Sequence, residues 1–281
     1  MDRKTKASLL ALLAFFCMAL FGIATKLALE QTSAFWVSFF AYLTGTLILT
    51  PYIAMQGGSY LRSQQYALLI NRAFFGTLAS FLYTISINFI PIVNATLLFN
   101  TAPVFIPLLS VLLLHKRLEK TLWLAVFIGF LGICFIIKPT KELFEQPGNL
   151  IGLASGFSLA IAYLSMKLLT NTDPGIRIIF YYLGLGTLFQ LPLLFFAGPL
   201  PEMHGIFYAI ISGALLLIAQ LSLVNAYRFA DASYVGVYQY STIVFVGLLE
   251  WILWGKIPTP LDLIGIVLVI FAGISIIKKR T

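Results

Sequence analysis

The stretch from Asn94 to Lys138 reads NATLLFNTAPVFIPLLSVLLLHKRLEKTLWLAVFIGFLGICFIIK. A second stretch of the same pattern, SYVGVYQYSTIVFVGLLEWILWGKIPTPLDLIGIVLVIFAGISIIK, runs from Ser233 to Lys278. Each stretch joins two apolar runs through a short turn that contains a lysine, Lys116 in the first and Lys256 in the second, and each ends in Ile-Ile-Lys. About 140 residues, half of the chain, separate the two copies, which indicates an internal duplication.

The composition is that of a membrane protein. Of the 281 residues, 60% are hydrophobic and 10% are charged, and the mean hydropathy is +0.97, whereas soluble domains have about 25% charged residues. Apolar runs of about 20 residues, enough to cross the hydrocarbon layer as helices, follow one another along the chain. They predict ten transmembrane helices, at 7–28, 33–55, 66–88, 93–114, 119–137, 149–169, 176–197, 204–226, 233–254 and 260–277.

The positive charges favour one orientation of these spans. The net charge of +8 would suggest nucleic-acid binding in a soluble domain, but 14 of the 18 Lys and Arg residues fall at one side if the N-terminus is inside. Arg72 is counted among these 14. This bias is the positive-inside rule. It predicts both termini in the cytoplasm, a bacterial inner-membrane location and no nucleic-acid partner.

Residues that would support catalysis, metal binding or ATP use are scarce. The chain has two cysteines, Cys17 and Cys134, each inside an expected span, and two histidines near span ends. It has neither a His-Glu-x-x-His pair nor a Gly-x-x-x-x-Gly-Lys-Ser/Thr loop. We therefore expect no cofactor, no metal site and no catalytic residues, with a membrane-embedded enzyme as the weaker alternative.

The fourth expected span contains polar and helix-breaking residues on one face. Asn100, Pro103 and Pro107 are spaced by three and four residues. Each proline removes a backbone hydrogen bond and kinks a helix, which a bilayer tolerates where polar groups or neighbouring helices satisfy the freed carbonyl. The pattern predicts a bent helix that lines a cavity. The alternative is that Asn100 only joins two helices by hydrogen bonds.

Two charged residues near the outer ends of spans are candidates for a gate. Lys26 lies near the end of the first span and Glu250 near the end of the ninth. A charge near a span end is tolerated because its stem reaches the interface. Lys26 is therefore either an interfacial lysine or a contact of the substrate path or its gate, and Glu250 is a possible coupling or gate residue.

Further polar and aromatic residues within or at the start of spans are candidates for a substrate path. Their side chains offer hydrogen bonds, ring stacking and cation-π contacts, although Trp36 also suits an interfacial belt. The ninth-span residues Gln239 and Tyr240 correspond to Asn100 in the duplication. The complete candidate set is Lys26, Trp36, Tyr83, Asn100, Pro103, Tyr163, Gln190, Gln220, Tyr238, Gln239 and Tyr240.

The halves of the duplication are expected to cross the membrane in opposite senses. The polar segment KPTKELFEQPG at 138–148 is the candidate junction, which gives a first repeat at 1–142 and a second at 143–281. Because five spans precede the junction, the second repeat enters from the other side. The predicted fold is therefore an all-α integral membrane protein of two inverted five-helix repeats. Within it, the pair Gly152 and Gly156 predicts close helix packing.

The chain resembles the ten-helix drug/metabolite transporter superfamily, EamA-type. The resemblance rests on GIATKLAL at 22–29, TAPVFIPLLSVLLL at 101–114, WLAVFIGFLGICFII at 123–137, IGLASGFSLAIAYLSMKLL at 151–169 and GIVLVIFAGISII at 265–277. It implies that Lys26, Pro103 and the polar residues of spans four and nine face a central substrate path. The chain departs from many relatives by having Lys116 and Lys256 where they have an acid, and Tyr42 where they have an arginine.

The resemblance implies a secondary transporter that moves a small organic solute by alternating access. The expected chamber is aromatic and amide-lined, with no acid or base near mid-depth, so an amino acid, a metabolite or a drug-like molecule is the expected solute. Proton-coupled carriers usually keep a carboxylate in the path, so we expect exchange or uniport, or coupling through a residue near the surface. The expected partners are the lipid bilayer and the solute, in a monomer or weak homodimer. A receptor or structural role without transport is the alternative.

Overall fold

The computed structural model describes residues 3–114, 146–230, 241–255 and 259–277, together with 124, 127–128, 131–132, 135, 235 and 238–239. Every regular element in these residues is a helix. The α-helices are α1 (Arg3–Leu29), α2 (Ala34–Gln56), α3 (Tyr66–Phe89), α4 (Ile92–Phe99), α5 (Ala102–Leu114), α8 (Pro147–Leu169), α9 (Gly175–Gln190), α10 (Met203–Phe229), α12 (Ser241–Trp254) and α13 (Pro260–Ile277), and the 3-10 helices are η1 (Gly58–Leu61) and η2 (Leu191–Phe196).

Six segments are helical, apolar and long enough to cross a membrane. They are α1, α2, α3, α8, α9 with η2, and α10, and they coincide with the first three expected spans and with the sixth to eighth. The fourth expected span consists of two helices, α4 and α5. The fifth lies largely outside the described residues. The multi-pass all-helical architecture is therefore confirmed in the part of the chain that the structure describes.

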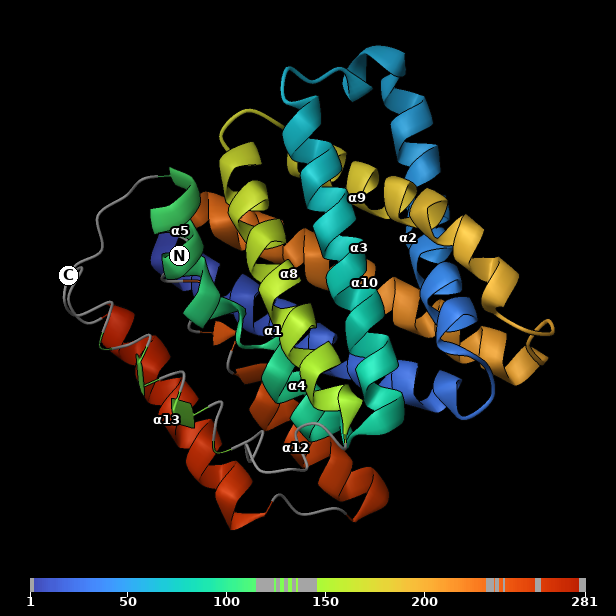
Figure 1. Cartoon of the computed structure of the whole chain (residues 1–281). Coiled ribbons are helices and arrows are strands. Elements are labelled where there is room, and N and C mark those ends of the chain that lie inside the picture. Colours follow the sequence, from blue (N-terminus) through green and yellow to red (C-terminus); the bar gives the residue numbers. More distant parts are fainter. Residues whose placement is uncertain are drawn as a thin grey trace.

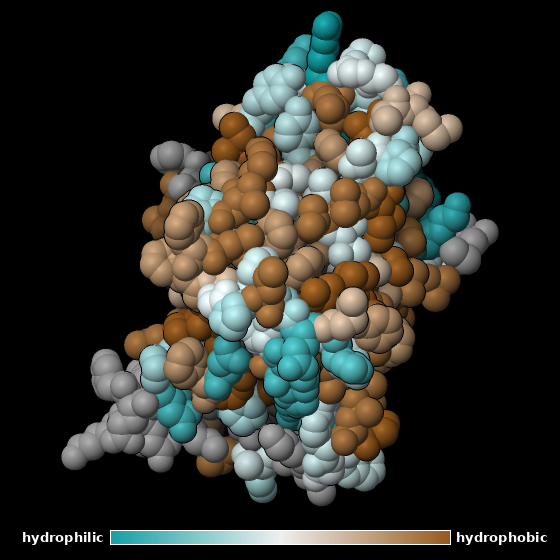
Figure 2. Space-filling view, turned by 90° about the vertical axis from the view of Figure 1, so that its right-hand side faces the viewer, coloured by the Kyte–Doolittle hydropathy of each residue, from teal (hydrophilic) through white to brown (hydrophobic). Residues whose placement is uncertain are grey.

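The surface of these helices is apolar. Large hydrophobic side chains such as Leu47, Met55, Phe195 and Ile252 are more than half exposed. Hydrophobic residues cover much of the middle of the face shown in Figure 2, and hydrophilic residues gather at its upper end and in its lower part. Patches of this extent are rare on soluble monomers, and acyl chains cover them in a bilayer.

The two halves of the chain are packed into each other (Figure 1). α1 lies along α10, and α3 lies along α8, so that each pair joins a helix from before residue 142 to one from after it. The buried cluster formed by these helices contains small residues such as Ala11, Ala14 and Ala219. Small side chains let helix backbones approach closely where water supplies no hydrophobic driving force.

The connecting segments gather at two ends of the bundle. At one end, the Ser33 hydroxyl donates to the carbonyl of Ala197 (2.8 Å) and the Trp36 indole to that of Pro199 (2.9 Å); we call this the 30–33 end. At the other, Arg177 donates to the carbonyl of Tyr60 (2.6 Å) and Arg228 to that of Asp173 (3.1 Å); we call this the 170–174 end.

Candidate functional site

A pocket lies between the two halves of the chain. Its cavity volume is about 10 Å³, room for about one water molecule, so the pocket is nearly closed in this conformation. Helices α1, α3 and α4 contribute most of its wall, and α8 and α12 complete it from the second half. The lining residues are Phe15, Met18, Phe21, Tyr83, Thr96, Phe99, Asn100, Tyr163 and Thr242.

A break in the fourth expected span forms one side of this pocket. α4 ends at Phe99 and α5 begins at Ala102, so the helix is interrupted at Asn100 and Thr101. Pro103, buried in the first turn of α5, has no amide hydrogen to bond the carbonyl of Phe99. Side chains bond the carbonyls beside the break, since Asn100 donates to the carbonyl of Thr96 (2.7 Å) and Thr101 to that of Leu98 (2.6 Å). The expected bend is therefore a complete interruption.

Glycines of α8 pack against this break. A Cβ atom at Gly156 would clash with the hydroxyl of Thr101 and the carbonyl of Leu98, and one at Gly152 would lie 2.8 Å from the Leu98 side chain. The close packing predicted for this Gly-x-x-x-Gly pair is confirmed. It holds the broken helix of the first half against the second half.

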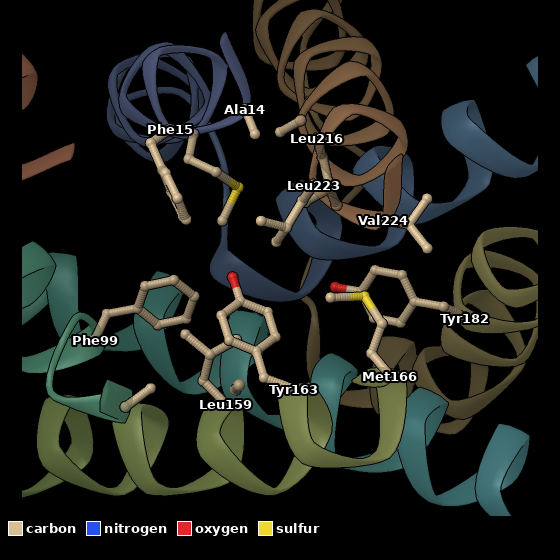
Figure 3. Packing of buried hydrophobic residues seen from close by; sticks show 14 of the residues in the cluster. Ala14, Phe15, Phe99, Leu159, Tyr163, Met166, Tyr182, Leu216, Leu223 and Val224 are labelled. Carbon is tan, nitrogen blue, oxygen red and sulfur yellow. The ribbon is translucent and has the colours of Figure 1, made fainter. Parts of the chain in front are cut away.

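Two hydroxyl groups in the pocket wall have no hydrogen-bond partner among the described residues. Tyr163 rises from α8 into the space enclosed by α1 and α10, with Phe15 and Phe99 beside it (Figure 3). Its phenol and the hydroxyl of Thr242 are both buried and make no hydrogen bond. An unpaired buried polar group costs about 1–3 kcal/mol, so these groups are available to a polar group of a bound molecule.

An ion pair lies beyond the pocket toward the 30–33 end. The Lys26 ammonium is 3.0 Å from a carboxylate oxygen of Glu250 and 3.9 Å from the centre of the Trp254 ring. Lys26 follows the pocket residue Phe21 by about 7.5 Å along α1, and Glu250 follows Thr242 by about 12 Å along α12. The Glu250 side chain is 2% exposed, so the pair is a buried contact between the two halves.

A second contact joins the same two regions at the other end. The Tyr238 hydroxyl donates to the Ser8 hydroxyl of α1 (2.8 Å). Close by, the Ser241 hydroxyl donates to the carbonyl of Tyr238 (2.6 Å), which repeats the contact of Thr101 with the carbonyl three residues before it. The ninth-span region thus contacts α1 on both sides of the pocket.

The remaining candidates lie away from the pocket wall. Trp36 donates its indole to a loop carbonyl, and Gln220 bonds Arg72. Gln190 and Gln239 are each 1% exposed, and neither side-chain amide has a hydrogen-bond partner in the part of the chain that the structure describes. Tyr240 lies outside the described residues.

Arg72 requires a correction of the sequence prediction. It was counted among the charges at the inner side of the membrane and was not recognised as buried. Arg72 is instead 1% exposed, about 9 Å inside α3 from its first residue. Its guanidinium donates to the side-chain oxygen of Gln220 (2.8 Å) and lies 4.0 Å from the centre of the Tyr182 ring. Arg72 is therefore a buried charge in the first third of α3 and not a surface one.

Sequence reasoning missed most of the apolar pocket wall. Phe15, Met18, Phe21 and Phe99 line the pocket, but large apolar residues within a span are ordinary. Nothing in their spacing distinguishes the pocket wall from helix packing. The polar members Tyr83, Asn100 and Tyr163 were recognisable because polar groups are costly within a span.

Comparison with known proteins agrees with this architecture. The model of the EamA-like transporter family matches residues 5–138 and again residues 146–278. A solved crystal structure superposes with a TM-score of 0.68 at 18% identity, covering 97% of this chain and 95% of the other, which shows the shared fold.

Curated relatives of similar length are transporters. The pseudopaline exporter CntI of Pseudomonas aeruginosa is 29% identical over 100% of this chain and 99% of its own. A riboflavin transporter of Vibrio cholerae is 25% identical over 87% and 83%, and an S-adenosylmethionine uptake transporter of Rickettsia bellii is 25% identical over 92% and 88%. With both halves matched by the family model, the chain belongs to the EamA-like transporter family, and it is a membrane transporter of small solutes rather than an enzyme.

Proposed function

We propose that this protein moves a small organic solute through the pocket between its halves by alternating access. The protein that performs this mechanism consists of ten helices in two inverted repeats, 1–142 and 143–281. The observation that carries the proposal is that α1 meets the ninth-span region on both sides of the pocket, through Lys26 and Glu250 and through Ser8 and Tyr238. Opening one contact while the other stays closed would expose the pocket to one side at a time.

The inverted arrangement is supported by the positions of two equivalent turns. The turn after α3 lies at the 30–33 end of the bundle, because the second half of α1 approaches both Tyr83 and Ile92. The corresponding turn after α10 lies at the 170–174 end, where Arg228 bonds Asp173. Equivalent turns at opposite ends are expected of inverted repeats.

The same arrangement supports a location and an orientation. We place the protein in the bacterial inner membrane, with the 170–174 end and both termini in the cytoplasm, because Lys and Arg gather on that side of the expected topology. A monomer or weak homodimer fits an arrangement in which the pocket is enclosed by one chain.

The pocket favours an organic solute with an apolar or aromatic part. Phenylalanine and tyrosine rings line much of it, and the free hydroxyls of Tyr163 and Thr242 supply polar contacts. An amino acid, a metabolite or a drug-like molecule meets this description. Riboflavin and S-adenosylmethionine, named for two relatives, are reasonable first compounds to test.

The pairing of Glu250 with Lys26 favours exchange or uniport. The Glu250 carboxylate is paired with the Lys26 ammonium at 3.0 Å, so the charge of this pair is balanced within the protein without a coupling ion. We therefore expect a proton gradient to drive no uptake by the wild type, so that Glu250→Gln causes no loss of proton-driven uptake. If this variant abolishes proton-driven uptake and spares exchange, Glu250 couples transport to protons.

The direct test is transport by purified protein in liposomes. Vesicles preloaded with unlabelled riboflavin, S-adenosylmethionine or one of the amino acids should accumulate the labelled form of a transported compound by exchange. Asn100→Leu, which places a bulky apolar group in the pocket wall, should slow this exchange. Leu124→Ala, at an exposed position, is the control and should not. Failure of the protein to move any solute in a broad metabolite panel would favour a receptor or structural role.

A further inference from the structure

Arg72 is a buried cation whose charge has no ionic partner among the described residues. The ion pairs within this part of the chain are Lys26 with Glu250 and Arg177 with Asp173. One of the three guanidinium nitrogens of Arg72 donates to Gln220, whereas Nε and Nη1 are buried without a hydrogen-bond partner among the residues that the structure describes. Two donors of a fully charged group are therefore unsatisfied inside a membrane protein.

Burying such a group is energetically costly unless a further partner accepts its free hydrogen bonds and balances its charge. A guanidinium stays charged in proteins, and a buried charge without a hydrogen-bonded partner costs several kcal/mol. The Tyr182 ring, 4.0 Å from the guanidinium, offsets part of this cost through a cation-π contact. The Gln220 amide oxygen satisfies one donor and brings no negative charge.

The surroundings are shaped to hold the guanidinium in this position. A Cβ atom at Gly76 would clash with Nη1 of Arg72 and would lie 2.7 Å from the Tyr182 ring, so glycine leaves room for both. The Tyr182 hydroxyl is in turn hydrogen bonded to that of Tyr42 at 2.5 Å. Helices α2, α3, α9 and α10 thus all contribute to this buried group, which we call the Arg72 cluster: Arg72, Tyr182, Gln220 and Tyr42.

The Arg72 cluster is connected to the pocket through a pair of tyrosines. The unpartnered Tyr163 of the pocket wall packs against Tyr227, with ring centres 6.3 Å apart, and both phenols lie within electrostatic range of Arg72. Tyr163 from α8 and Tyr182 from α9 both direct their hydroxyls into the interior (Figure 3). The Arg72 cluster therefore lies near Tyr163 of the pocket wall, and none of its four members lines the pocket itself.

We propose that Arg72 and Gln220 bind the carboxylate of the transported solute, so that the protein carries organic monocarboxylates with an apolar or aromatic body. The carboxylate accepts from one of the free groups, Nε or Nη1, and from the second N–H of Nη2, the paired arrangement that guanidinium groups favour. One negative charge neutralises one guanidinium, whereas a phosphate dianion would leave a net buried charge. The inference rests on the proposed transport function and names its substrate class.

Ligand-induced stabilisation of the full-length protein in detergent tests the assignment. The probes are 3-phenylpropionate, benzoate and phenylacetate, each compared with its uncharged amide, and phenyl phosphate as the dianion. The carboxylates should raise the apparent melting temperature of the wild type, because a ligand bound only by the folded state stabilises it, and the amides should not. Equal shifts with carboxylate and amide, a larger shift with phenyl phosphate, or no shift with any carboxylate would overturn the proposal.

Three variants test whether Arg72 and Gln220 form the carboxylate-binding site. Arg72→Gln should weaken apparent carboxylate affinity by about tenfold or more, as expected for loss of a charged hydrogen bond. Arg62→Gln, which removes an exposed arginine, should leave it unchanged. Gln220→Glu should supply a counter-ion within the protein and therefore raise the melting temperature without ligand while abolishing the carboxylate response. A Gln220→Glu protein that still responds like the wild type would contradict the assignment.

Transport measurements separate this inference from the transport function itself. In liposomes, Arg72→Gln should lose exchange of carboxylate solutes. If Arg72→Gln and the wild type exchange carboxylates at the same rate, the carboxylate assignment is wrong and the carrier function stands. If the wild type exchanges no solute, the carrier function itself fails.

Discussion

Single buried charges have the largest expected effects on this protein. Lys26→Met leaves Glu250 buried without its ionic partner, and removing one member of a buried pair costs about 3–5 kcal/mol. The double variant Lys26→Met with Glu250→Met replaces the pair by apolar groups and should recover most of this loss. Thermal melting of the two variants and the wild type in detergent measures the difference. Equal melting temperatures for the single variant and the wild type would show that the pair does not stabilise the fold.

Asp173 gives a pH-dependent prediction at the 170–174 end. Burial raises the pKa of its carboxyl, but hydrogen bonds from Arg177 and Thr172 outweigh this and hold the pKa below its usual range. The folded state therefore binds the proton less readily than the unfolded state, whose aspartate has a pKa of about 3.9. The stabilisation is complete above that value and is lost as the pH falls through the lower folded pKa.

Asp173→Asn should accordingly lower the melting temperature at pH 7, and the gap from the wild type should shrink only below about pH 4. Melting curves of both proteins from pH 7 to pH 3 measure this gap. A gap that is already closed at pH 5.5 would mean that the carboxylate charge is not stabilising.

The residues that could be predicted were those whose chemistry is unusual within a span. Asn100, Tyr83 and Tyr163 were recognised as polar groups and line the pocket. Lys26 and Glu250 were each singled out, but a partner 224 residues away cannot be identified from one sequence. Arg72 was misplaced because hydropathy assigns an arginine near the start of a span to the surface. Its partners Gln220 and Tyr182 come from helices that only the fold brings together.

At the scale of elements, the packing of α8 on the broken fourth span should be sensitive to one methyl group. Gly156→Ala inserts a Cβ atom against Thr101 and the carbonyl of Leu98, and overpacking of this kind costs about 1–3 kcal/mol. A reduced melting temperature is the expected result. Gly247→Ala on α12 is the matched control, because nothing lies within 4 Å of its new Cβ atom. Equal behaviour of the two variants would contradict close packing at Gly156.

The existence of the helices was more predictable than their interruptions. Runs of about 20 apolar residues predict spanning helices because an unpaired backbone group in lipid is too costly. The site of a break depends on local hydrogen bonds such as that from Thr101 to Leu98. The prolines therefore predicted a bend and could not define its form.

At the scale of the whole molecule, the inverted arrangement predicts that equivalent lysines face opposite sides. In a protein without native cysteines, Lys116→Cys should react with a membrane-impermeant maleimide only from the cytoplasm. Lys256→Cys should react only from outside. Labelling of intact cells and of inverted vesicles distinguishes the two sides. Reaction of both positions from the same side would rule out inverted repeats.

The central claim is that the contact between α1 and α12 must open for a solute to pass. Lys26→Cys with Glu250→Cys, in a protein lacking Cys17 and Cys134, allows the two helices to be joined across the contact by a short cleavable bifunctional maleimide. Solute exchange in liposomes should stop when the two positions are joined and recover when the linker is cleaved, while either single-cysteine variant should be unaffected by the reagent. Undiminished exchange by the fully joined protein would contradict the account.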